Sequence, residues 1–308
     1  MRFAHSGRFL SGIVVPLSAL RTATSPGCGE YPDLESLAEL AGSWGFDLVQ
    51  LLPLNDTGTQ TSPYSALSAF ALHPLYLRIG DLPELAESGP ARMFRAESAA
   101  LVERFGGSAR VPHEELLAAK LELLEKVWAA KRAAAAGDRD SAHAEAAAGG
   151  SARLGCDAEL EAWTKANPWI KAYAAFVELK ARADGAPWWT WERHRDPSRA
   201  DIEALWAGRL APEGSGAAGG FAGRLRFHAW VQMRASAQFR AAAEALAATG
   251  VALMGDIPIL MNDDSAEVWA RRDCFRLELR AGAPPDMYSS LGQNWGFPIY
   301  DWEAMSAD

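Results

Sequence analysis

Four stretches of the sequence combine hydroxyl, carboxyl and aromatic side chains in patterns that could bind a sugar. They are Asn55–Gly58, Ser62–Phe70, Gly255–Pro258 and the longer stretch Gly282–Gly296. Hydroxyl and carboxylate groups can pair with the OH groups of a sugar, and a flat aromatic ring can cover its apolar face. The residues therefore indicate polyol binding before any fold is considered.

Asp56 and Asp256 could also serve as a pair of carboxylates. Each follows an apolar run that reads as a strand, and two facing carboxylates are what glycoside chemistry requires. Spacing along the chain cannot show that the two side chains face each other. Capping of a helix, or formation of a turn, explains either aspartate equally well.

The stretch Gly282–Gly296 has a stiff start, because Pro284 and Pro285 both fix the backbone angle φ. A stiff loop that carries Asp286, Tyr288 and Trp295 suits polyol binding, although an ordinary surface turn is the alternative. The chain has 12 Trp residues. Tryptophan more often fills a core, so composition alone favours core packing over sugar stacking.

The sequence lacks the motifs of several other kinds of active site. The sequence has no Gly-rich dinucleotide or Walker loop, no zinc-protease motif and no nucleophile elbow. Its six histidines are scattered, and Cys28, Cys156 and Cys274 form no closely spaced pair. We expect no metal site, no cofactor and no disulfide, and we interpret the thiols as buried and inert.

Charge and hydropathy exclude further classes. The chain has 308 residues and a formal net charge of −9, which disfavours nucleic acid and anionic membrane as partners. It contains no apolar run long enough to span a bilayer. Residues 1–8 do not resemble a secretion signal, so we expect a cytoplasmic protein.

The elements that must position these residues read as an α/β fold. Short apolar runs at 12–17, 47–54 and 251–259 predict buried parallel strands, and a helix capped by Asp33 and stopped by Gly45 joins the first two. Residues 82–245 read as mostly helical, with 133–152 as a solvated loop or frayed helix end. Ser265 should cap a short helix. Repeated β-α steps predict a parallel sheet, either doubly wound or a (β/α)₈ barrel.

In their order along the chain, these motifs resemble the amylomaltases, the disproportionating 4-α-glucanotransferases of glycoside hydrolase family 77. The resemblance is strongest in Gly255–Pro258 and from Pro284 to Trp302. It covers most of the chain and includes Ser11–Ile13, Gln50–Leu54, Ser62–Tyr64, Ser68–Phe70 and Trp188–Trp191. Two departures stand out: Asn55-Asp56 where many relatives have Gly-Pro, and Leu291 where many have Thr.

The resemblance implies a (β/α)₈ barrel with a mostly helical subdomain inserted after the second strand. On that basis residues 1–81 would hold strands 1 and 2 with the first glucan-binding loop. Residues 82–245 would form the helical insert. Residues 246–308 would hold strand 3 and the Pro-Pro-Asp loop. The chain would thus contribute strands 1–3 of an incomplete barrel.

The resemblance also implies an activity. The family transfers a segment of an α-1,4-glucan to the 4-OH of an acceptor glucose or maltodextrin, with retention and without metal or organic cofactor, in maltodextrin, starch and glycogen metabolism. Retention requires an Asp nucleophile and a Glu acid/base close together. The positions that match substrate-binding residues of the family are Ser62, Tyr64, Asp256, Asp286, Gln293 and Trp295.

None of the three catalytic carboxylates of the family is matched, because the Arg-Ile-Asp-His-like nucleophile motif does not occur in this sequence. We therefore expect these carboxylates after Asp308, and we expect the 308 residues alone to form an open, aggregation-prone sheet and to be inactive. Two alternatives stay open: a non-catalytic glucan-binding fragment, and an amylolytic hydrolase on the same barrel.

Overall fold

The computed structural model describes residues 9–142, 157–212 and 219–307. Residues 1–8 and Cys156 lie outside these ranges. The expectation of a cytoplasmic protein rested in part on residues 1–8, and the interpretation of the thiols as buried and inert included Cys156. The helices and strands follow one another as β1 (Gly12–Val15), α1 (Asp33–Ser43), β2 (Leu48–Leu51), α2 (Arg95–Phe105), α3 (His113–Ala142), α4 (Ala158–Ala166), α5 (Ile170–Arg182), α6 (Arg199–Trp206), α7 (Gly219–Ala248), β3 (Ala252–Met254), α8 (Ala266–Ala270), β4 (Phe275–Ala283), β5 (Gln293–Tyr300) and α9 (Trp302–Ala307).

The chain divides into two units. The first comprises Met1–Leu54, Leu72–Glu161 and Trp230–Asp256; the second comprises Asn55–Ala71, Ala162–Ala229 and Ile257–Asp308. Helix α7 contributes residues to each unit. Within the described parts of the chain, no helix is both long and apolar enough to cross a membrane.

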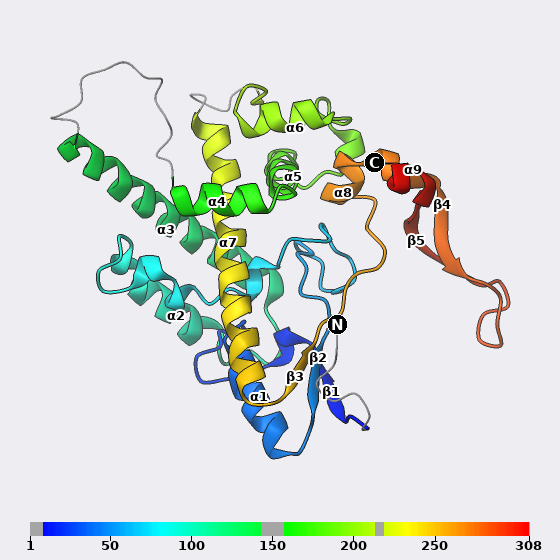
Figure 1. Cartoon of the computed structure of the whole chain (residues 1–308), viewed down its shortest axis with the longest axis horizontal. Helices are drawn as coiled ribbons and strands as arrows, with labels where there is room; N and C mark the ends of the chain where they lie inside the picture. The colour runs from blue at the N-terminus through cyan, green and yellow to red at the C-terminus, as the bar shows by residue number, and fades with distance from the viewer. Residues whose placement is uncertain (1–8, 143–156, 213–218, 308) are drawn as a thin grey trace. The chain divides into compact units, whose positions relative to one another are not determined.

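Strands β1, β2 and β3 form a parallel sheet in the first unit (Figure 1). The strand order is β1-β2-β3, with Gly12 opposite Leu48 and Leu48 opposite Ala252. The three predicted strands and the α/β class are thus confirmed. All three strands are shorter than the predicted runs at 12–17, 47–54 and 251–259. The first two end before Pro16 and Pro53, because proline cannot donate a hydrogen bond to a neighbouring strand.

Helix α1 joins β1 to β2 and packs against β2. Its apolar residues Leu34, Leu37 and Ala41 are buried, as their helical spacing predicts. Gly45 follows with a φ of +78°, a left-handed conformation that glycine adopts without strain and that ends a helix. The helix therefore stops where the sequence indicated.

Asp33 does not cap helix α1, so this prediction was wrong. Pro32 occupies the N-cap position, and Asp33 is buried. Its carboxylate accepts hydrogen bonds from Thr22 Oγ1, from Ser25 Oγ and from the backbone N–H of Glu30, each at 2.8 Å. The physical reason is burial, because an enclosed carboxylate must be satisfied by several donors.

A buried ion cluster ties helix α3 to the segments around it. Lys120 on α3 is 1% exposed, and its Nζ donates to Glu30 Oε1 at 2.6 Å and to the carbonyl oxygens of Leu75 and Leu77 at 2.6 and 3.0 Å. Arg78 Nε donates to the other oxygen of Glu30 at 2.8 Å. All three protons of the ammonium group are therefore used within the protein.

The end of helix α7 that belongs to the first unit is fixed in a similar way. Arg234 pairs with Glu84 at 2.8 Å and with Glu159 at 3.0 Å, and the indole N–H of Trp230 donates to Glu84 at 2.9 Å. Trp230 also lies against Trp128 of α3, with ring centroids 5.5 Å apart. Charged and aromatic contacts together hold α7 against α3 and the segment around Glu84.

The predicted helical stretch 82–245 does contain helices α2 to α7. Helix α3 continues to Ala142, so residues 133–142 are helical and only the rest of the predicted loop lies outside the described residues. Cys28 and Cys274 are both buried. Burial raises the pKa of the Cys28 thiol to about 12, which supports the interpretation of that thiol as inert.

The second unit has an aromatic core. Phe176 of α5, Trp191 and Trp269 of α8 contact one another with ring centroids 5.8 to 6.0 Å apart. Ser265 caps α8 as predicted, because its side chain accepts a hydrogen bond from the N–H of Val268. Tryptophan therefore fills the core here, the more common of its two roles.

Glu178 of α5 lies among three basic side chains in the same unit. It pairs with Arg182 at 2.8 Å, with Arg224 at 3.2 Å and with His228 at 3.3 Å. Burial raises the pKa of Glu178, but the hydrogen bonds from His228 and Arg182 and the charge of Arg224 outweigh it and lower the pKa to about 2. The carboxylate is therefore ionised across the whole neutral range.

Strands β4 and β5 form an antiparallel hairpin that the sequence reading did not predict (Figure 1). Phe275 lies opposite Tyr300, and Ala283 lies opposite Gln293. The alternation of apolar and charged residues from Phe275 to Arg280 is the signal of a half-exposed strand. The hairpin places the Pro-Pro-Asp segment in the loop that joins its two strands.

Replacing Lys120 with Met should lower the free energy of unfolding by about 3–5 kcal/mol, because Glu30 would stay buried without its nearest cation. Urea denaturation followed by circular dichroism measures this change. Lys126→Met is the control, since Lys126 lies on the same helix but forms an exposed pair with Glu97; its denaturation midpoint should stay where it is. A Lys120→Met protein as stable as the parent would show that Arg78 alone satisfies Glu30.

Candidate functional site

The segment Asn55–Ala71, which follows β2, forms a closed loop; we refer to it as the 55–71 loop. The N–H of Asp56 donates to the carbonyl oxygen of Ala71 at 2.8 Å, and the N–H of Leu67 donates to that of Asp56 at 2.7 Å. These hydrogen bonds bring the two ends of the loop together. The loop therefore has a defined shape that does not depend on a bound ligand.

The carboxylate of Asp56 has a structural role in this loop. It is 5% exposed; its Oδ2 accepts from the hydroxyl of Tyr173 at 2.6 Å and its Oδ1 accepts from the N–H of Gly58 at 2.9 Å. Both carboxylate oxygens thus have donors within the second unit. Of the two explanations that the sequence left open for Asp56, the structure supports formation of a turn.

Ser68 connects the same loop to helix α8. Its hydroxyl donates to Glu267 Oε1 at 2.7 Å and accepts from the N–H groups of Phe70 and Ala71 at 3.1 and 3.2 Å. The N–H of Ala266, at the start of α8, donates to the carbonyl oxygen of Leu67 at 2.8 Å. Hydrogen bonds of both side chains and backbone therefore join the loop to the helix.

Sequence reasoning missed Glu267, because its partner Ser68 lies 199 residues away and a lone acid on a short helix carries no signal. Among the described residues, Glu267 Oε2 is enclosed and has no hydrogen-bond partner. Burial raises the pKa of Glu267 to about 7, although hydrogen bonds from Ser68 and from backbone amides oppose the increase. The carboxyl group therefore exchanges its proton near neutral pH.

The predicted residues Ser62 and Tyr64 lie on the outer part of the 55–71 loop. Ser62 is exposed, and Tyr64 is 44% exposed. Further along the loop Phe70 stacks on Trp169, with ring centroids 5.8 Å apart and an angle of 23° between the planes. The structure thus brings hydroxyl and aromatic groups together on one loop, as the sequence indicated.

The predicted residues Asp286, Gln293 and Trp295 all belong to the hairpin. Asp286 is exposed, and its Oδ1 accepts from the N–H groups of Tyr288 and Ser289 at 2.8 and 2.7 Å. Gln293 Oε1 accepts from the indole N–H of Trp295 at 2.9 Å. Trp295 is 49% exposed, so the hydrogen bond orients an aromatic ring that solvent can reach.

Gly292 makes this turn possible. Its φ of +72° is left-handed, and a Cβ atom there would lie 2.5 Å from the carbonyl oxygen of Ala283. Any side chain would therefore be strained and would collide with the neighbouring strand. The glycine explains how the chain turns back directly before Gln293.

Asp256, the sixth predicted residue, follows β3 and is partly buried. It belongs to the first unit, whereas the other five residues belong to the second. The structure thus brings Ser62 and Tyr64 together on one loop and Asp286, Gln293 and Trp295 on one hairpin. A role for Asp256 beside them stays a prediction.

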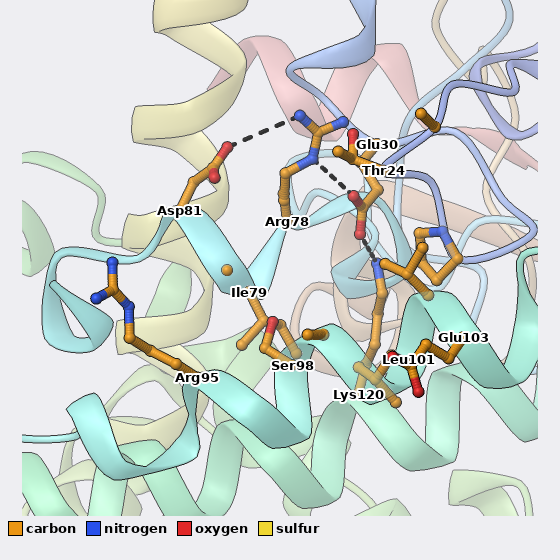
Figure 2. A pocket seen from close by; sticks show the side chains of 15 residues that line it. Thr24, Glu30, Arg78, Ile79, Asp81, Arg95, Ser98, Leu101, Glu103 and Lys120 are labelled. Atoms are coloured by element: carbon orange, nitrogen blue, oxygen red, sulfur yellow. Dashed lines mark hydrogen bonds and ion pairs between the residues drawn. The ribbon is translucent and has the colours of Figure 1, made fainter.

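The first unit contains a cavity of about 440 Å³ that none of the six predicted residues lines. Figure 2 shows that the side chains of Arg78 and Lys120 converge on Glu30 at its wall. The charged residues of the lining balance in number, with Arg78, Arg95 and Lys120 against Glu30, Asp81 and Glu103. Because the charges of Arg78, Lys120 and Glu30 already pair with one another, we assign this wall of the cavity to the ion cluster that supports the fold.

Across residues 9–142, 157–212 and 219–307, no group of three or more His, Cys, Asp or Glu side chains could hold a metal ion. The polar groups that the structure does gather are hydroxyl, amide, carboxyl and aromatic groups, on the 55–71 loop and on the hairpin. Such groups bind polyols.

The fold is that of an α/β protein and is shared with solved amylomaltases. An amylomaltase from Streptococcus agalactiae in complex with acarbose superposes with a TM-score of 0.67 at 19% identity, covering 97% of this chain and 55% of that one. The amylomaltase from Corynebacterium glutamicum gives 0.66 at 20% identity, covering 94% and 36%. At these identities the likeness shows the fold alone.

Residues 15–308 match the family Glyco_hydro_77, described as 4-alpha-glucanotransferase, and the chain belongs to this family. It is 31% identical over 304 residues to 4-alpha-glucanotransferase DPE2 of Oryza sativa subsp. japonica, covering 97% of this chain and 29% of the rice protein. It is 34% identical over 270 residues to the 4-alpha-glucanotransferase of Thermus thermophilus, covering 84% and 45%. The chain thus spans half or less of the length of these relatives.

The raised pKa of Glu267 predicts a pH-dependent stability. Folding raises this pKa from 4.5 to about 7, so the folded protein binds the proton more tightly than the unfolded chain. The resulting stabilisation is complete below about pH 4.5 and disappears as the pH rises to about 7; its full size is on the order of 3 kcal/mol. Glu267→Gln should remove this slope.

Thermal unfolding from pH 4.5 to 7.5 measures the effect. Glu303→Gln is the control, because Glu303 is an exposed carboxylate on α9 of the same unit and its replacement should leave the slope unchanged. Equal slopes for the parent and Glu267→Gln between pH 4.5 and 7 would mean that Glu267 is ionised throughout that range.

Proposed function

We propose that this chain carries the glucan-binding part of a 4-α-glucanotransferase. The reaction is the transfer of a segment of an α-1,4-glucan to the 4-OH of an acceptor glucose or maltodextrin, through a retaining double displacement and without a cofactor. The observation that carries the proposal is the family match over residues 15–308. The exposed hydroxyl and aromatic groups of the loop and the hairpin support it.

We further propose that β1, β2 and β3 are part of a (β/α)₈ barrel, with residues 1–81 and 246–308 in the barrel and 82–245 in a helical insert. Parallel pairing of all three strands supports this arrangement. So does the exposure of Val14 and Met254, which are 59% and 47% exposed. A closed barrel would cover apolar side chains such as these.

Each predicted binding residue has a proposed role. Tyr64 and Trp295 offer half-exposed rings on which glucose units can stack, while Ser62, Asp286 and Gln293 offer hydrogen bonds to sugar hydroxyls. Asp256, after β3, would shape the position at which the bond is cleaved. The nucleophile, the acid/base and the third carboxylate would come from sequence outside these 308 residues.

The amylomaltase from Streptococcus agalactiae was solved in complex with acarbose, and a sugar-like ligand of that kind is what the exposed aromatic groups of this chain would accept. The α-1,4-glucans and maltodextrins are therefore the proposed substrates.

The protein translated from the whole gene should convert maltotriose into glucose and longer maltodextrins, whereas the 308 residues alone should release no glucose. Chromatography of the products with time tests this. Glucose without longer maltodextrins would identify a hydrolase instead. Turnover by the 308 residues alone would show that Asp56, Asp256 or Asp286 does catalytic work.

Trp295→Ala in the whole gene product should reduce kcat/KM for maltotriose. The expected reduction corresponds to an increase of roughly 1–3 kcal/mol in activation free energy, the range that buried aromatic contacts contribute at binding sites. The control is Trp44→Ala, since Trp44 is 61% exposed and lies in the first unit. Its kcat/KM should equal that of the parent. An unfolded Trp295→Ala protein would instead show that Trp295 is needed for the fold.

A further inference from the structure

A buried hydroxyl group holds the C-terminal end of the 55–71 loop. Ser68 is 0% exposed, and its Oγ makes three hydrogen bonds, to Glu267, Phe70 and Ala71. A hydroxyl has one proton to donate and two lone pairs to accept with. Because both lone pairs already receive backbone N–H groups, the proton must go to an acceptor, and Glu267 supplies it.

Glu267 also lies close to the hairpin. Burial raises the pKa of Tyr300, and the charge of Glu267 adds to the increase. Tyr300 is the last residue of β5, the strand that begins with Gln293 and contains Trp295. Glu267 thus interacts with two different segments of the second unit, by a hydrogen bond with Ser68 and electrostatically with Tyr300. Both segments carry residues that the proposed function assigns to the glucan.

Helix α8, which carries the Glu267 carboxyl group, is held in place by its packing in the second unit. Val268 and Trp269, the next two residues, are buried, and Trp269 packs on Phe176 of α5. The indole N–H of Trp269 also donates to the carbonyl oxygen of His194 at 2.7 Å. The position of Glu267 is therefore set by the core, and the loop takes its position from Glu267.

We propose that Glu267 is a positioning residue for glucan binding: through Ser68 it holds the 55–71 loop in the shape that presents Ser62 and Tyr64 to the sugar. The proposal rests on the proposed function, because it assumes that these two residues contact glucan. It assigns a role to a residue that touches no substrate itself and that acts through one buried hydrogen bond.

Two measurements on the same chain test the proposal. Hydrogen exchange at the amides of Phe70 and Ala71 reports the anchor, because these amides are held by Ser68 Oγ. Calorimetric titration with maltoheptaose reports binding. Glu267→Ala should raise exchange at the two amides, and the Kd for maltoheptaose, by about tenfold each, the size expected for one hydrogen bond to a charged group.

Three further variants make the test specific. Ser68→Ala removes the same hydrogen bond from the other side and should reproduce both effects. Glu267→Gln keeps an acceptor oxygen for Ser68 and should retain the parental Kd within about twofold. Glu303→Ala is the matched control, because Glu303 is an exposed carboxylate on α9 of the same unit; it should change neither measurement.

The proposal is overturned if Glu267→Ala and Ser68→Ala leave the Kd unchanged while exchange at Phe70 and Ala71 rises, since the anchor would then exist without serving the glucan. It is also overturned if exchange rises equally at all amides, which marks general destabilisation. Failure of the parental chain to bind maltoheptaose at all would overturn the proposed function, and exchange at the two amides would still show whether the anchor exists.

Discussion

Parallel pairing of β2 with β3 is the constraint on which the rest of the structure depends. Two parallel neighbours cannot be joined by a short turn, because the chain must first return to the end of the sheet where it started. Here the return extends from Leu51 to Ala252 and contains helices α2 to α7. The helical part of the protein is thus one very long connection between adjacent strands.

A connection of this length needs its own core, and buried charged residues contribute to it. Lys120 with Glu30, and Arg234 with Glu84, are buried pairs in the first unit, while Glu178 has three basic neighbours in the second. Buried pairs contribute little net stability but penalise any arrangement that separates them. We infer that they fix which helices pack together, whereas apolar burial drives the packing.

The sequence allowed the strands, helix α1 and the helical stretch to be predicted, because each depends on local apolar spacing. It did not reveal the roles of Asp33 and Glu267. Glu267 is held by a partner 199 residues away, and Asp33 by donors in the loop that precedes its helix. An isolated acid looks the same in the sequence whether it caps a helix or anchors a loop. The hairpin was missed because the Gly- and Pro-rich composition of 282–298 masked the alternation at 275–280.

The candidate site was predicted as a set of residues, and the structure adds how they are held. The loop that carries Ser62 and Tyr64 is hydrogen-bonded through Asp56 to Tyr173 and through Ser68 to Glu267. Tyr173 and Glu267 lie outside the motifs that carry the family resemblance. The ring of Trp295 is oriented by a hydrogen bond to Gln293, which lies two residues away. Two residues so close in sequence occur together in one motif. Residues that hold the site from distant positions in the sequence can therefore be found only from the structure, whereas neighbouring ones can be found in a motif.

The measurement that tests the central claim most directly is a map of hydrogen exchange along the chain with and without maltoheptaose. The account predicts slower exchange at residues 62–65 and 286–295, and no change at residues 78–81 and 95–103, which contribute to the wall of the cavity in the first unit. Protection at the cavity with none on the loop or the hairpin would contradict it, because the glucan would then bind among the charges that we assign to the fold.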